Sequence, residues 1–337
     1  MEEDILKEVL DHLGDSIKDK GKFIKLSYDS YEPLEITQDN FIKIEDIDVN
    51  GKICFIDGGN AEILKASNFS LQFIRIYSTV YLENKRIENK KYEFYLLVRS
   101  YDKEGKIFFK TQIFGDKIID EFEINSLDKS IMQGNSRADV SFVGNVARRF
   151  AELNVGKELI SRVDNCDSII FDGSLDTKYN NEKELFDDIY NLAKEKKVNV
   201  CGLSKTCELF TDKGGSVISL LNELQPETKW YYYPLAKFDK MYDICFVKLN
   251  ENSQYIFRLD FNGNVDNVLS LLSHNSNDPV FMGYPYGLIE ADRFARISNK
   301  EVEILKTKFM IKAGKDWKFI SDMMKTKDSH GILDNIS

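Results

Sequence analysis

Two aspartates stand directly after short apolar segments, and glycine follows each of them. Asp57 follows the run CFI and precedes Gly58, and Asp172 follows the run IIF and precedes Gly173. Both runs predict buried strands that end at the aspartate, and neighbouring strands would bring both carboxylates to one sheet edge. Paired hard oxygen donors suit Mg²⁺ or Mn²⁺, and two such ions promote phosphodiester hydrolysis. The alternative interpretation is that both aspartates are turn or cap residues.

Two more charged side chains, close to these segments in the sequence, are candidates for binding a metal ion or a phosphate. Glu152 belongs to the helical stretch RRFAE before Asp172, where it is either a third metal ligand or a solvated helix residue. Lys205 follows the short apolar run VNVCGLS, where its point charge could hold a phosphate. The alternative is an exposed loop lysine, and no glycine-rich phosphate-binding loop precedes it.

A segment near the C-terminus combines aromatic, acidic and basic side chains. It runs from Gly283 through Tyr284 and Tyr286 to Asp292, Arg293 and Arg296. Tyrosines can stack on bases and arginines can pair with phosphates. The alternative is a turn followed by a solvated amphipathic helix.

The elements that must position these residues follow an α/β pattern. Helices are predicted at 3–20, 137–163 and 181–196, and a turn and helix at the C-terminal end. The first helix has an apolar stripe that is expected to pack on the core, with a second subunit as the alternative. Aromatic and β-branched runs predict antiparallel strands between residues 69 and 115, and shorter buried strands predict a mixed sheet. We expect an acidic helix and loop-like lead-in at 1–50, one domain at 51–320 and a flexible tail at 321–337.

The composition disfavours several kinds of functional site and several classes of protein. The 337 residues carry 46 Lys+Arg and 56 Asp+Glu, a net charge of -10, with five scattered cysteines and three histidines. Disulfides, a zinc site and histidine-based catalysis are therefore disfavoured, so carboxylates must carry most of any catalysis. No apolar run approaches the ~20 residues of a membrane helix. The acidic first residues also argue against a signal peptide, and a cytoplasmic protein without membrane association is expected.

In this order and spacing, five motifs resemble the NurA nuclease family. They are FIDGG at 55–59, RRFAE at 148–152, FDGSL at 171–175, LSKT at 203–206 and GYPYGLIEADRFAR at 283–296. The resemblance implies an RNase H-like fold and a metal-dependent DNA nuclease that uses Mn²⁺ or Mg²⁺, with two ions expected. It also implies single-strand endonuclease and 5′→3′ exonuclease activity in DNA-end resection, a homodimer, and a hexameric HerA-like ATPase as partner.

The same resemblance assigns roles to individual residues. Asp57, Glu152 and Asp172 match the family's metal-binding carboxylates, although Glu158 lies only about two turns from Glu152. Lys205 matches a lysine near the family's site, and Tyr284 matches the family's Tyr-Pro motif. The chain departs from the family at Asp292, where histidine is common. Aspartate can bind a metal or accept a proton, but it cannot donate a proton as imidazolium does.

Two other functions remain open from the sequence. An ATP-using phosphotransferase with an RNase H-like core would also place Asp-Gly turns around phosphates, but this chain lacks its duplicated domain and glycine-rich adenosine loops. A non-catalytic partner of an ATPase motor is the second alternative, favoured by the departure at Asp292.

A net charge of -10 is unfavourable for DNA binding, but most of this charge lies in the first 50 residues. Residues 1–50 carry 14 Asp+Glu and 6 Lys, a net of -8, so residues 51–337 carry only -2. We expect the acidic N-terminal region to lie off the DNA path. Arg148, Arg149 and the basic strip from Arg293 to Lys318, which includes Arg296, are expected to line it.

Overall fold

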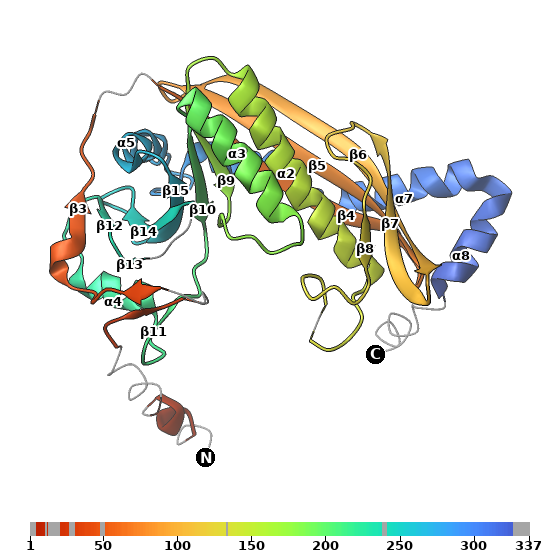
Figure 1. The fold of residues 1–337 in the computed structure, drawn as a ribbon, viewed down its shortest axis with the longest axis horizontal. Helices are drawn as coiled ribbons and strands as arrows, with labels where there is room; N and C mark the ends of the chain where they lie inside the picture. The colour runs from red at the N-terminus through yellow and green to blue at the C-terminus, as the bar shows by residue number, and fades with distance from the viewer. Residues whose placement is uncertain are drawn as a thin grey trace.

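The three-dimensional description rests on a computed structural model of the chain. It describes residues 5–10, 12, 21–26, 31–47, 51–132, 134–237 and 241–325. A large mixed sheet runs through the molecule, with helices on both faces (Figure 1). This confirms the mixed α/β architecture predicted from the sequence.

The central sheet has eleven strands within the described residues. Strand β9 pairs in parallel with both β4 and β10. All other pairs of neighbouring strands in this sheet are antiparallel. In spatial order the strands are β3 (Phe41–Lys43), β12 (Trp230–Tyr232), β14 (Asp243–Lys248), β15 (Phe257–Asn262), β10 (Asn199–Ser204), β9 (Cys166–Asp172), β4 (Lys52–Lys65), β5 (Phe69–Leu82), β6 (Lys85–Lys103), β7 (Lys106–Gly115) and β8 (Glu123–Asn125).

Neighbouring residues of β4 point to opposite faces of the sheet, and each face has its own apolar core. Ile56 packs in the cluster that contains α2 (Val143–Arg162) and α3 (Glu182–Lys196). Phe55 packs in the cluster that contains α5 (Val265–Asn275) and α6 (Tyr286–Ala295). The helices predicted at 137–163 and 181–196 are therefore confirmed as α2 and α3.

The remaining elements lie at the two ends of the sheet. Helices α7 (Asn299–Ala313) and α8 (Trp317–Lys325) pack at the end formed by β4 and β5 (Figure 1). Helix α4 (Val217–Leu224) lies at the other end, near two small sheets. Those sheets pair β1 (Ile24–Lys25) with β11 (Phe210–Thr211), and β2 (Glu32–Pro33) with β13 (Ala236–Lys237).

The acidic lead-in is more ordered than the sequence predicted. Its strand β3 extends the central sheet by pairing with β12, so the prediction of a loop-like segment at 21–50 is wrong in this part. The physical reason is aromatic packing, because the Phe41 ring meets Trp230 and Tyr232 edge-on at 4.7 and 4.8 Å. At the other end, α8 continues to Lys325, past the boundary expected at residue 320. The rest of the expected tail lies outside the described residues.

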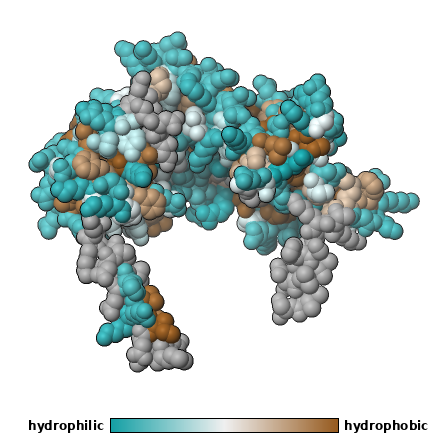
Figure 2. Space-filling model, turned by 60° about the horizontal axis from the view of Figure 1, so that its bottom comes forward, coloured by the Kyte–Doolittle hydropathy of each residue, from teal (hydrophilic) through white to brown (hydrophobic). Residues whose placement is uncertain are grey.

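The first described residues form a short helix that does not pack on the core. Residues 5–10 are helical, and the apolar side chains of Ile5, Leu6, Val9 and Leu10 are half-exposed or more. Figure 2 shows a hydrophobic patch on a projection at the lower left of the molecule. The default expectation that this stripe packs on the core is therefore wrong for residues 5–10, and most of the remaining 3–20 lies outside the described residues. None of the described helices is long and apolar enough to cross a membrane.

Candidate active site

Three aspartates gather at the edge of the sheet where β9 ends. Asp57, Asp172 and Asp292 each offer a carboxylate oxygen, and these atoms lie within 4.8 Å of one another. Ile56 pairs with Phe171 across the parallel strands, so Asp57 and Asp172 follow side by side. Asp292 arrives from α6, which packs on the same face. The tertiary structure thus joins three carboxylates that are up to 235 positions apart in the chain.

The sequence predicted that a strand ends at Asp57, and this prediction is wrong. Strand β4 continues to Lys65, and Gly58 and Gly59 pair with Ile76 and Arg75 of β5. A β-carbon on Gly58 would lie 2.6 Å from a carboxylate oxygen of Glu152 on α2. A β-carbon on Gly59 would lie 2.4 Å from the carbonyl oxygen of Ala295 on α6. The glycines are needed for close approach of both helices, not for a turn.

Substitution of Gly59 by alanine is expected to displace α6 and the Asp292 that it carries. The obstructing atom is a backbone carbonyl, which cannot swing aside as a side chain can. We expect a loss of about 1–3 kcal/mol in unfolding free energy and roughly 10²-fold in activity. Gly105→Ala is the matched control, because Gly105 has φ +76° and open space around it. It should lose stability but keep its activity; equal activity losses in both variants would contradict the explanation.

Lys205 joins two of the three aspartates. Its ammonium group lies 2.6 Å from Asp172 and 3.0 Å from Asp292. Burial alone would lower the pKa of Lys205, but the two carboxylates outweigh this and raise it. The lysine is therefore a fixed positive charge at the carboxylate cluster, as required for holding a phosphate.

Tyr284 contacts this cluster from the protein interior. Its hydroxyl lies 3.4 Å from Asp172, and Lys205 lies 5.6 Å from its ring centre. The side chain is fully buried, so it cannot stack on a base as the sequence interpretation suggested. Burial, followed by the charge of Asp172, raises the pKa of the Tyr284 phenol, so the hydroxyl stays protonated and can donate to the carboxylate.

Glu152 lies beside Asp57 but is engaged by arginines. Its carboxylate is buried, 2.5 Å from Arg148 and 3.6 Å from Arg149, and it is not part of the three-aspartate group. Glu158, the sequence alternative, instead lies 2.9 Å from Lys90. The structure thus brings Glu152 to the site, although its role as a metal ligand stays a prediction.

The cluster carries more negative charge than its surroundings balance. Burial raises the pKa of Asp57 to about 8, with further contributions from the charges of Asp172 and Glu152. Carboxylates forced together in this way gain most from a bound cation, which cancels their mutual repulsion. The all-oxygen donor set also matches the preference of Mg²⁺ and Mn²⁺. The residues therefore fit the divalent ions predicted from the sequence.

The arginines predicted to contact DNA occupy different environments. Arg149 is largely buried and binds Glu182 at 2.7 Å and the carbonyl of Ser174 at 2.9 Å. This position is structural, so the predicted DNA contact is not supported for Arg149. Arg148 is partly exposed but lies against Glu152. Arg293 and Arg296 are exposed on or next to α6, and Arg296 also lies 2.8 Å from Asp292.

Sequence reasoning missed a buried carboxylate that holds the loop after Asp172. Asp260 is fully buried in β15, accepts the backbone N–H of Leu175 at 2.9 Å and pairs with Arg258 at 2.7 Å. Burial raises the pKa of Asp260 to about 6, against the opposing effect of Arg258. The available signal was a charged pair, Arg258 and Asp260, within the apolar run YIFRLDF.

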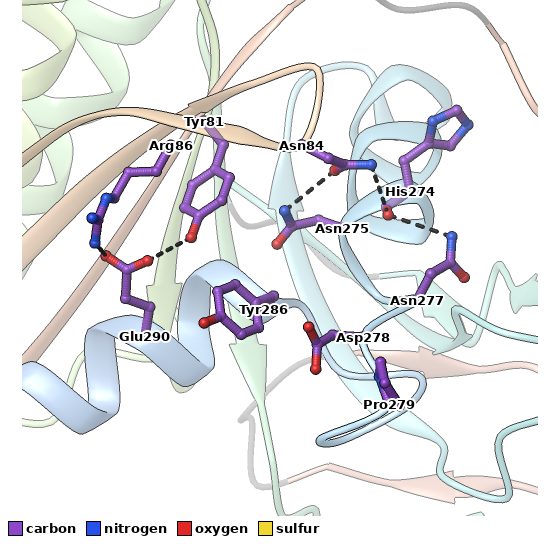
Figure 3. Close-up of a pocket in the computed structure, with 10 residues that line it drawn as sticks. All are labelled: Tyr81, Asn84, Arg86, His274, Asn275, Asn277, Asp278, Pro279, Tyr286 and Glu290. Carbon is purple, nitrogen blue, oxygen red and sulfur yellow. Dashed lines mark hydrogen bonds and ion pairs between the residues drawn. The ribbon is translucent and has the colours of Figure 1, made fainter.

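A cavity of about 600 Å³ lies on the side of α6 away from the three aspartates. Figure 3 shows Tyr81 and Arg86 meeting the carboxylate of Glu290, at 2.5 and 2.9 Å. Tyr77 donates to the same carboxylate at 2.7 Å. Glu290 and Asp292 are two residues apart on α6 and so point to different sides of the helix. Glu290 therefore fastens α6 to β5 and helps to place Asp292.

The family model for the NurA domain matches residues 51–297, which is most of the chain. The chain belongs to the NurA family. The family predicted from the five motifs is thereby confirmed. No protein with a curated description matches the chain in sequence.

Solved structures support the fold of this NurA protein. The NurA nuclease from Sulfolobus solfataricus is 17% identical, with a TM-score of 0.57, and the match covers 92% of this chain and 95% of that chain. Endonuclease V from Ciona intestinalis, in complex with DNA, is 12% identical with a TM-score of 0.40, covering 80% and 94%. The catalytic domain of human endonuclease V is 9% identical with a TM-score of 0.38, covering 86% and 94%. The fold shared with the Sulfolobus NurA nuclease agrees with the predicted mixed central sheet flanked by helices.

Proposed function

We propose that this NurA protein is a metal-dependent deoxyribonuclease. The observation that carries the proposal is the group of Asp57, Asp172 and Asp292 with Lys205 bound to two of them. A cavity of about 620 Å³ opens beside Asp172 and Lys205, and Lys178 and Thr206 also line it. A strand of DNA could therefore reach the carboxylates from solvent.

Each side chain of the site has a separate role in the proposed reaction. Asp57, Asp172 and Asp292 would hold two divalent ions, Mn²⁺ or Mg²⁺. When bound, these ions supply Lewis-acid stabilisation of the phosphate oxygens and a more acidic water. Lys205 neutralises charge that develops on the phosphate, and Tyr284 fixes the orientation of Asp172. Glu152 adds negative charge behind Asp57, which favours cation binding, and a ligand role for it remains part of the proposal.

The proposal is tested with labelled single-stranded DNA and the purified chain. We expect cleavage with Mn²⁺ or Mg²⁺, none with EDTA, and a loss of roughly 10³-fold in Asp172→Asn, because several kcal/mol of charge stabilisation disappear. Cleavage that persists in EDTA, or that is unchanged in Asp172→Asn, would contradict it. A wild-type chain without any metal-dependent cleavage would favour the alternative of a non-catalytic partner.

The finer activities are proposed from family membership. We propose single-strand endonuclease and 5′→3′ exonuclease activity in DNA-end resection, which substrates labelled at either end would distinguish. We also propose a homodimer and a HerA-like hexameric ATPase as partners. The exposed apolar residues of the N-terminal helix offer a surface for such a partner. Light scattering of the purified chain measures the first association, and co-purification with the ATPase measures the second.

A further inference from the structure

We infer that Tyr255, held by Phe257 and Phe281, forms a stacking site for an unpaired nucleobase of the strand held at the carboxylates. The inference rests on the proposed nuclease function and goes beyond it by naming a base-binding residue. Tyr255 lies in the loop between β14 and β15, which the sequence interpretation did not single out. Three observations carry the inference: the position of this loop, its aromatic contacts and its exposure.

The strand register places Tyr255 at the catalytic edge of the sheet. Strands β10 and β15 are antiparallel, and Ser204 at the end of β10 pairs with Arg258. The residues that precede Arg258 therefore continue past the end of β10, in the same direction as Lys205. Tyr255 stands three residues before Arg258, so it projects on the side where the carboxylate cluster lies.

A continuous set of aromatic contacts connects Tyr255 to the cluster. The ring of Tyr255 meets Phe281 edge-on at 5.0 Å, and Phe281 stacks on Tyr284 at 5.3 Å. Phe257 lies 5.1 Å from Tyr284 and completes the packing. The hydroxyl of Tyr284 reaches Asp172 at 3.4 Å. Only one aromatic ring, that of Phe281, therefore lies between the outer tyrosine and Tyr284, whose hydroxyl contacts a catalytic carboxylate.

The outer end of this set is open to solvent and apolar. Tyr255 is 56% exposed, although its ring stacks on the buried Phe257 at 6.3 Å and meets the half-buried Phe281 edge-on. Val280 and Met282, which flank Phe281 in sequence, are 75% and 38% exposed. An aromatic ring held on one side and free on the other presents the flat apolar surface on which a base stacks.

Two loops lock this surface in place before any ligand arrives. The backbone N–H of Tyr255 donates to the hydroxyl of Ser253 at 3.1 Å. Gly283, at φ +92°, packs so closely that a β-carbon there would lie 2.3 Å from the same hydroxyl. Ordering costs on binding are therefore small, which favours a preformed binding site.

A nucleobase fits this surface better than a protein side chain does, because the surface and the carboxylate cluster lie at the same edge of the sheet. A strand whose phosphate meets Lys205 and the bound ions has its neighbouring bases within reach of the same edge. Stacking requires an unpaired base, since a base inside a duplex has both faces covered. The site would thus favour single-stranded over duplex substrate, whatever the base sequence.

The test measures cleavage kinetics on a short single-stranded oligothymidylate. We expect Tyr255→Ala to raise KM about 5- to 100-fold with little change in kcat, and Tyr255→Phe to retain the wild-type KM because the ring remains. Phe319→Ala is the matched control, because Phe319 is 70% exposed on α8 at the other end of the molecule. A KM for Tyr255→Ala within twofold of wild type would overturn the inference.

An oligonucleotide with abasic sites separates stacking from phosphate binding. On it, wild type and Tyr255→Ala should have the same KM, and an equal loss by Tyr255→Ala on both substrates would also overturn the inference. If the wild type does not cleave, the proposed function fails by itself. The stacking site is then judged by fluorescence anisotropy of the same two oligonucleotides in Ca²⁺, with the same expected ratios of Kd and the same contrary outcomes.

Discussion

Asp57→Asn is expected to lose metal-dependent cleavage on the order of 10³-fold or more, the largest effect of a single substitution in this protein. Asparagine keeps the size of the side chain but removes the charge that holds the ion, and several kcal/mol of charge stabilisation correspond to this factor. Burial raises the pKa of Asp57, and the charges of Asp172 and Glu152 raise it further, so Asp57 belongs to the same electrostatic cluster as these two carboxylates. The rate is measured on labelled single-stranded DNA over a range of Mn²⁺ concentrations.

The same substitution is expected to stabilise the metal-free protein. Burial and two neighbouring carboxylates oppose the ionised form of Asp57, and asparagine carries no charge to oppose. We expect the thermal midpoint at pH 8 to rise by roughly 5 °C without metal, and the stabilisation by added Mn²⁺ to shrink. Opposite signs for activity and metal-free stability distinguish a functional carboxylate from a structural one.

Glu158→Gln provides the matched control for this experiment. Glu158 is a carboxylate on α2, as Glu152 is, but it pairs with Lys90 and Arg162 rather than with the site. We expect its activity to stay within a few-fold of wild type. If Asp57→Asn cleaved DNA at the wild-type rate, or if it lost stability as Glu158→Gln does, the assignment of Asp57 would fail.

The apparent affinity for Mn²⁺ or Mg²⁺ is expected to rise about tenfold per pH unit between pH 6 and pH 8, and then to level off. Metal binding requires an ionised carboxylate, and the pKa of Asp57 is raised to about 8. Below that value metal binding must displace the proton of Asp57, which weakens binding as the pH falls. Calorimetric titrations in buffers of different ionisation enthalpy measure both the affinity and the proton release.

The stability of the metal-free protein should change with pH in the opposite direction. The folded pKa of Asp57 lies above its ordinary value of 3.8, so the folded state binds the proton more tightly than the unfolded state. This contribution to stability is present in full at low pH and is lost as the pH rises toward 8. Asp57→Asn should lack this component. A metal affinity that is flat from pH 6 to pH 8, or the same pH dependence in Asp57→Asn, would contradict the mechanism.

Most of the secondary structure could be predicted from local sequence. Periodic apolar residues marked α2 and α3, and aromatic and β-branched runs marked β5, β6 and β7, because these patterns report which face of an element is buried. Local sequence failed at β4, where Gly58 and Gly59 suggested a turn. Glycine is required at both positions because helices pack closely on the strand from both sides, and neither helix is adjacent to the strand in sequence.

The chemical types in the site were also visible in the sequence, because the site is built from ionisable residues that stand out after apolar strands. Asp57, Asp172 and Lys205 follow this rule, and the five motifs identified the family. The functions of individual tyrosines and arginines were not visible. Exposure decides whether Tyr284 or Tyr255 can meet a base, and exposure depends on packing between distant segments.

The sequence alone therefore determined the NurA family, the α/β class and the donor chemistry, since each depends on residue type and order along the chain. Only the tertiary structure decided which carboxylates share one site. Asp292 joins Asp57 and Asp172 because α6 packs against β4, while Glu152 is held by arginines on the other face. Distances between side chains arise from packing of the whole sheet, and no local pattern contains them.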